Sequence, residues 1–146
     1  MSFQFSLSAV LRVREGIEKH EERTLQTIQL AVVRTSRQIE ELSARISDSH
    51  HARVKALEQT ISGAHLHALL WEEKGAEQQL IALLAQMQVL EQERAKQMKV
   101  YQAAHQDRQM LTDMQKRQRE RYDREWLREE QKRLDDIFVA RRHRVL

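Results

Sequence analysis

The most constraining feature of this sequence is that almost nothing in it would stop an α-helix. Its 146 residues include no proline and only three glycines, Gly16, Gly63 and Gly75. Proline interrupts helices through ring clash, and glycine weakens them through backbone entropy. Aromatic residues make up 5% of the chain and charged residues 32%, which leaves too little apolar surface for a compact core. We therefore predict an all-α chain of long, thin helices.

Apolar residues in the first half have the spacing of a coiled-coil seam, with intervals of three and four residues. Two eleven-residue intervals, Ile17 to Ile28 and Ile46 to Leu57, predict local unwinding of the supercoil. The seam residues predicted in this half are Val10, Val13, Ile17, Leu25, Ile28, Val32, Thr35, Ile39, Leu42, Ile46, Leu57 and Ile61.

A turn is predicted at 62–64, because glycine is preferred just past a helix end and Gly63 follows Ser62 there. Gly75 is the alternative turn site, within a helix-forming stretch. The prediction is one domain over 1–146, an antiparallel coiled-coil hairpin with helices at about 6–61 and 65–142.

The second helix is predicted to continue the seam with mixed apolar and polar residues. Its last part, beyond about Trp126, is expected to have no partner helix. The predicted seam residues are Leu80, Leu83, Met87, Leu90, Arg94, Gln97, Tyr101, Ala104, Arg108, Leu111, Gln115, Gln118 and Tyr122.

Several function classes are disfavoured by what the sequence lacks. Without cysteine the chain cannot form disulfides or Cys-ligated metal sites. The histidine pairs His50–His51 and His65–His67 are spaced wrongly to share a helix face. No nucleophile elbow or phosphate-binding glycine loop is present. We expect no enzymatic activity, cofactor or metal, and no apolar run approaches the roughly 20 residues of a membrane span.

The charge pattern leaves two kinds of partner open. Residues 116–146 carry eleven Lys or Arg and seven Asp or Glu, so this end is basic. A basic stretch could bind phosphates, but the interleaved acids disfavour nucleic acid. Large aromatics on a thin rod are candidates for protein contacts, and Trp71 and Trp126 are the two tryptophans.

Two terminal stretches resemble the flagellar export protein FliJ family. The opening Phe3-Gln4-Phe5-Ser6-Leu7, followed by Leu11-Arg12-Val13-Arg14-Glu15, is similar to the start of that family. The closing pattern is Tyr122-Asp123-Arg124-Glu125 with Glu130-Gln131-Lys132-Arg133-Leu134-Asp135-Asp136, where Asp136 replaces the usual Glu.

The resemblance implies a cytoplasmic component of the flagellar type III export apparatus, similar to the central stalk of rotary ATPases. It implies binding to the export ATPase hexamer, the cytoplasmic domain of the export gate and export chaperones, and contact with the membrane only through partners. Alone, the chain is expected to be a monomer. The alternatives are a homologous stalk of an injectisome, or a generic coiled-coil scaffold.

The resemblance also suggests residues for two contacts. For the export gate these are Gln38, Leu42 and Trp71, although Arg45 and Ser49 stand where aromatics often occur in the family. For the ATPase ring the candidates lie at the open end of the hairpin and are Leu7, Leu11, Arg14, Tyr122, Lys132 and Asp135.

Overall fold

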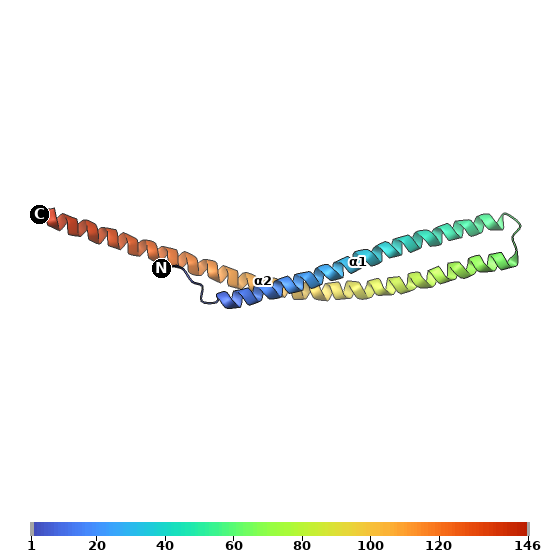
Figure 1. Cartoon of the computed structure of the whole chain (residues 1–146), viewed down its shortest axis with the longest axis horizontal. Coiled ribbons are helices and arrows are strands. Elements are labelled where there is room, and N and C mark those ends of the chain that lie inside the picture. The colour runs from blue at the N-terminus through green and yellow to red at the C-terminus, as the bar shows by residue number, and fades with distance from the viewer. Residues whose placement is uncertain (1, 146) are drawn as a thin grey trace. The chain divides into compact units, whose positions relative to one another are not determined.

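The computed structural model describes residues 2–145 as two long helices packed against each other (Figure 1). Helix α1 spans Ser8–Leu57 and helix α2 spans Gly63–Val145, joined by a loop at 58–62. The described residues contain no strand. The predicted all-α, two-helix hairpin is thus confirmed.

The two helices contribute to two compact units. One unit takes in the chain up to His20 together with the segment from Gln102 onward, and the other is Glu21–Tyr101. In a helix pair each side chain contacts only residues at the same position along the helix axis. No single core therefore extends along the whole chain. Each unit therefore has its own set of contacts between α1 and α2.

The seam of α1 is an unbroken alternation of four- and three-residue steps. It includes polar residues that the apolar pattern had passed over. Every seam residue except Arg14 is buried or half-buried. The seam begins at Leu7, just before α1, and consists of Leu7, Leu11, Arg14, Glu18, Glu21, Leu25, Ile28, Val32, Thr35, Ile39, Leu42, Ile46, Ser49, Arg53 and Ala56.

The predicted seam was wrong near both ends of α1. Val10, Val13, Ile17 and Leu57 are exposed, by 43, 61, 39 and 57% respectively. The seam passes instead through the residues next to them, Leu11, Arg14, Glu18 and Ala56, so the two eleven-residue intervals are absent. A continuous heptad explains this, because it maintains one contact face without local unwinding.

The seam of α2 agrees with the prediction at every position from Leu80 to Tyr122, all of which are buried or half-buried. The same alternation extends back through Ala76 and Glu73 to Leu66. After Tyr122 every residue up to 145 is exposed except Glu130, which is half-buried. Residues 123–145, called the tail below, continue α2 past the start of α1 (Figure 1).

The turn differs from its prediction in position and in the role of glycine. Helix α1 ends at Leu57, and Gly63 is the first residue of α2. The Ser62 hydroxyl accepts a hydrogen bond from the His65 N–H at 3.1 Å, which is the geometry of a helix N-cap. No described glycine has a positive φ. The expected left-handed glycine at the end of α1 was therefore wrong, and the alternative site Gly75 lies inside α2.

Candidate partner-binding surfaces

The N-terminal segment before α1 packs onto the last paired turn of α2. The Phe3 and Tyr122 rings have centroids 5.6 Å apart, and Phe5 and Leu11 are only 6 and 7% exposed. The Ser8 N–H donates to the Phe5 carbonyl at 3.2 Å, which links this segment to the start of α1. The aromatic rings of the N-terminal segment thereby cover the end of the helix pair, next to the start of the tail at residue 123. A hollow of about 500 Å³ beside them is lined by Phe3, Gln4, Phe5, Ser8, Gln115 and Arg119.

A polar cluster replaces apolar seam residues in the same unit. Arg108 of α2 donates two hydrogen bonds to the Glu18 carboxylate of α1, one of them from Nη2 to Oε1 at 3.3 Å. His105 Nδ1 lies 2.9 Å from the same Oε1. The Glu18 and Arg108 side chains are 15 and 24% exposed. Nearby, Arg14 pairs with Asp107 at 3.3 Å, so α1 and α2 are aligned here by charge.

The hydrogen bond from Arg108 is the largest influence on the Glu18 carboxyl and holds its pKa below the ordinary value of 4.5. Burial opposes this shift, and the hydrogen bond and charge of His105 add to it. A lowered pKa in the folded state means that Glu18 stabilises the fold above pH 4.5. That contribution is lost as the pH falls through the lower, folded-state pKa.

Substitution of Glu18 with Gln is accordingly expected to change how stability depends on pH. Above pH 4.5 the variant should be less stable than the unaltered chain, and acidification should reduce this difference. Urea unfolding followed by circular dichroism across the acidic range measures it. Glu22→Gln, at an exposed position of α1, is the control and should leave the profile unchanged. Parallel profiles for the Glu18 variant and the unaltered chain would contradict the expectation.

The second unit has its own polar contacts across the helices. Gln97 Nε2 donates to the Glu21 backbone carbonyl at 3.1 Å and also to its carboxylate. Glu73, only 9% exposed, lies 3.1 Å from Arg53 and 3.6 Å from His50. These contacts occupy seam positions, so they align the helices near both ends of this unit.

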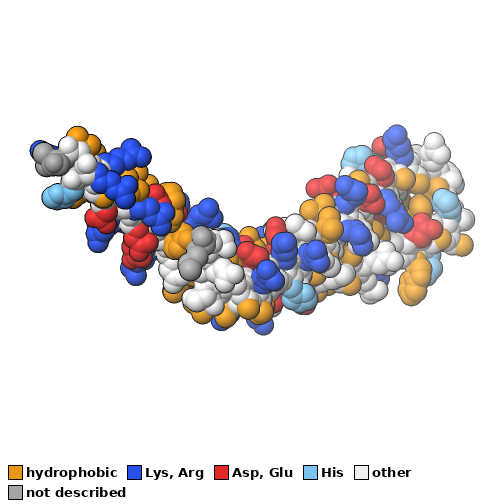
Figure 2. Space-filling view, turned by 60° about the vertical axis from the view of Figure 1, so that its left-hand side comes forward, with side chains coloured by type: hydrophobic (Ala, Val, Ile, Leu, Met, Phe, Trp, Pro, Cys, Tyr) orange, Lys and Arg blue, Asp and Glu red, His pale blue; other side chains and the backbone are white. Residues whose placement is uncertain are grey.

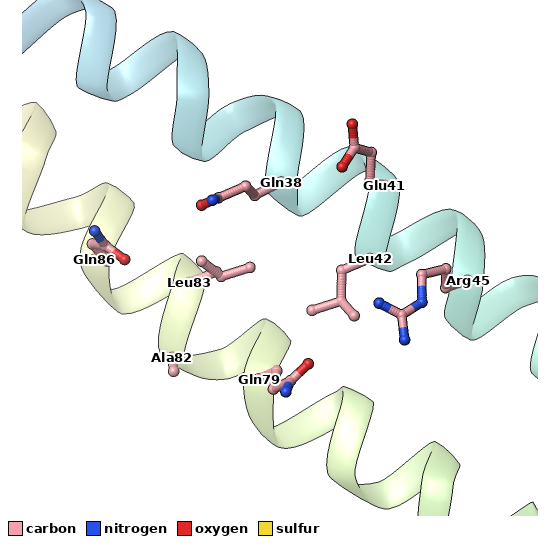
Figure 3. A pocket seen from close by; sticks show the side chains of 8 residues that line it. All are labelled: Gln38, Glu41, Leu42, Arg45, Gln79, Ala82, Leu83 and Gln86. Atoms are coloured by element: carbon pink, nitrogen blue, oxygen red, sulfur yellow. The ribbon is translucent and has the colours of Figure 1, made fainter.

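Between these polar contacts lies a hollow of about 440 Å³ between α1 and α2, called the interhelical groove below. Leu42, 5% exposed, and Leu83 point toward each other across it (Figure 3). Amide and charged side chains surround these two leucines, giving an apolar floor with polar edges. The residues that line the groove are Gln38, Glu41, Leu42, Arg45, Gln79, Ala82, Leu83 and Gln86.

Trp71 lies on another surface of the same unit. Its side chain is 70% exposed, and its ring centroid is 6.4 Å from that of His67. It lines a smaller hollow of about 240 Å³ with Lys74, Gly75 and Gln78, all on α2. A Cβ at Gly75 would meet no atom within 4 Å, so space beside the tryptophan is open.

The residues suggested for the ATPase ring differ in how much of their surface the hairpin already covers. Leu11 is buried and Tyr122 contacts Phe3, so both hold the helix pair together and offer a partner little surface. Leu7 is half-buried, and Arg14 is exposed but paired with Asp107. Lys132 and Asp135 are exposed on the tail, about 15 and 20 Å beyond Tyr122 at 1.5 Å per helical residue.

The residues suggested for the gate are likewise divided. Gln38 and Leu42 lie together in the interhelical groove, whereas Trp71 lines the separate hollow on α2. Arg45 completes one edge of the groove. The groove thus contains a cation next to its apolar floor.

Among the polar residues that align the helices, the predicted seam included Gln97 and Arg108 but missed Glu18, Glu21, Arg53 and Glu73. Glu18, Glu21 and Arg53 lie at seam spacing, but a search for apolar residues passes over them because they are charged. A signal was present: in α1 the four-three count through Leu25, Leu42 and Ile46 reaches these positions when it is continued in both directions without regard to polarity.

Within residues 2–145 no group of three or more His, Asp or Glu side chains is arranged to hold a metal ion. Over the same residues, neither helix has a stretch long and apolar enough to cross a membrane. Comparison with protein-family models, curated proteins and solved structures found no match to this chain.

Proposed function

We propose that this chain is a stalk-like component of the flagellar type III export apparatus. It binds the export ATPase ring and the export gate, promotes ATPase assembly and activity, and escorts export chaperones. It acts in the cytoplasm and reaches the membrane only through these partners. The proposal rests on the terminal motifs together with one structural observation. In the part of the chain that the structure describes, the helical tail has no partner helix, and it begins where the Phe3 and Tyr122 rings pack together at the end of the helix pair.

Contact with the ATPase ring is assigned to the tail and the end of the helix pair next to it. A helix that enters the ATPase ring has to be rigid. The packed Phe3, Phe5 and Leu11 side chains support the base of the tail. Lys132 and Asp135 are exposed there, so their charges are available to a partner. Complementary charge mainly sets the rate and orientation of such docking.

Contact with the gate is assigned to the interhelical groove. Its apolar floor and polar edges resemble the centre and rim of a protein interface. Gln38 and Arg45 on α1 and Gln79 on α2 offer hydrogen bonds around Leu42 and Leu83. Trp71, as an exposed aromatic, is a second anchor on this unit.

The ATPase assignment is tested by phosphate release from the purified export ATPase, with increasing amounts of this protein. The unaltered chain should stimulate hydrolysis. The double variant Lys132→Glu with Asp135→Lys exchanges the two tail charges without changing net charge. We expect its half-maximal stimulation to require at least about threefold more protein, as for misplaced charges at an interface rim.

The matched control is Glu93→Lys with Lys96→Glu, which exchanges two exposed charges of α2 at the same three-residue spacing. It should stimulate as well as the unaltered chain. Lack of stimulation by the unaltered chain would refute the stalk proposal. Equal loss in both variants would place the contact elsewhere than on the tail.

A further inference from the structure

The tail carries an exposed apolar stripe that the helix pair does not use. Its members recur at helical spacing, so they share one face, and they are exposed by 45 to 68%. Continuing the α2 seam past Tyr122 in the same steps reaches only charged residues as far as Asp136. The stripe is therefore a separate surface from the seam, and it consists of Trp126, Leu127, Leu134, Ile137 and Phe138.

Charge along the tail is divided between its two ends. Residues 123–136 carry six acidic and four basic side chains, whereas 137–145 carry three arginines, one histidine and no acid. In the space-filling view, basic side chains lie near the end of the tail and acidic ones follow further in (Figure 2). A helix with opposite charge at its two ends complements an antiparallel copy of itself.

We propose that the apolar stripe binds the tail of a second copy of this chain, with the two tails antiparallel. The stripe and its neighbours fit alternating three- and four-residue steps at Leu127, Glu130, Leu134, Ile137, Arg141 and Arg144. A two-fold axis between 135 and 136 sets Leu134 opposite Ile137 of the other copy, and Glu130 opposite Arg141. Each of these pairs occurs twice, as two-fold symmetry requires.

The alternative arrangements are less favourable on charge. Parallel tails would set Glu130 against Glu130 and Arg141 against Arg141, and like charges at such positions repel. Insertion of the stripe into an anionic lipid surface would bring the six acids of 123–136 close to that surface. Binding to such membranes relies on basic residues on the polar face, and here acids offset them.

The contact should be weak. Glu130 already lies 3.2 Å from Arg133 of its own helix, and an exposed pair of that kind is readily exchanged because it contributes little. The overlap of the two tails is about 27 Å long at 1.5 Å per residue, which is short for a stable interface. The chain would then be a monomer at low concentration and a dimer at high concentration.

Sedimentation of the purified full chain over a concentration series tests the proposal without any ATPase, so its outcome is independent of the proposed function. We expect a monomer–dimer equilibrium that weakens with salt, because the charge pairs are exposed. Ile137→Asp should raise the dimer dissociation constant at least about tenfold, the effect of losing 1.4 kcal/mol. Val139→Asp is the matched control, since Val139 is 53% exposed against 45% for Ile137 but lies off the stripe, and it should have little effect.

Charge exchange and labelling test the antiparallel geometry. Glu130→Arg and Arg141→Glu should each weaken the dimer, and the two changes in one chain should restore it. The chain has no cysteine, so spin labels at Arg128→Cys in one copy and His143→Cys in another are specific. Antiparallel tails bring these labels to the same level, whereas parallel tails separate them by about 22 Å along the axis.

Three outcomes would overturn the proposal. One is a strictly monomeric chain at high concentration, and another is a dimer that Ile137→Asp and Val139→Asp weaken equally. The third is a monomer that co-sediments with phosphatidylglycerol vesicles and loses this binding in Ile137→Asp, which would assign the stripe to a membrane.

Discussion

Replacing Leu25 with alanine is expected to lower the free energy of unfolding by about 2–3 kcal/mol, the lower part of the range for buried leucine. Leu25 is 6% exposed in the α1 seam, and truncation leaves a gap that a thin helix pair can only partly close. Urea unfolding followed by circular dichroism measures the change.

The control for this prediction is Leu30→Ala on the same helix, where the side chain is 63% exposed. The two substitutions change helix propensity equally, so the difference between them reports burial. Leu30→Ala should alter stability by no more than about 0.5 kcal/mol. Similar losses for both variants would mean that the seam does not run through Leu25.

Replacing Arg108 alone with leucine is expected to lower stability by about 2 kcal/mol, because Glu18 would remain largely buried without its main partner. Replacing Glu18 and Arg108 together with leucine should instead raise stability to at least that of the unaltered chain. Apolar substitutes for a desolvated ion pair are often neutral or stabilising. A double-mutant cycle with both single variants isolates the interaction.

The control for the second prediction is Arg14→Leu. Its ion pair with Asp107 is 44 and 51% exposed, and such pairs contribute at most about 1 kcal/mol. This variant should therefore have much less effect than Arg108→Leu. A double variant less stable than Arg108→Leu alone would show that the cluster acts through other contacts.

The polar seam residues can fix the register between α1 and α2, which apolar seam residues alone cannot do. A uniform apolar seam would allow α1 and α2 to slip by a heptad at little cost. Glu18 with Arg108, and Glu73 with Arg53, find their partners in one register only. Polar residues at seam positions commonly trade stability for such specificity. The Leu–Leu double variant should thus be stable but less uniquely aligned.

The sequence was sufficient to predict the helical hairpin and much of its seam. Between Leu25 and Ile46, and between Leu80 and Leu90, hydrophobic spacing located the contact face. From Leu90 to Tyr122 the same three-four count, continued through polar residues, located it as well. Ile17 and Leu57 were misassigned because the actual seam residues beside them, Glu18 and Ala56, are less apolar. Only the pairing of α1 with α2 reveals that Glu18 has a partner.

The surroundings of the suggested partner-binding residues could not be read from the sequence, for a related reason. Gln38 and Leu42 do share a groove, but Leu11 proved to be buried. A leucine at helical spacing has the same appearance in sequence whether it faces a partner helix or a partner protein. The structure separates these cases because it shows which side chains the hairpin already covers.

The most direct test of the account is a distance within one molecule between spin labels at Ser47→Cys on α1 and Gln78→Cys on α2, both exposed positions of the Glu21–Tyr101 unit. Packed helices lie about 8–10 Å apart. The labels should therefore be within about 20 Å of each other, and the distance should persist when labelled protein is diluted with unlabelled protein. A broad, long distance, or a short one that disappears on dilution, would contradict a hairpin formed by a single chain.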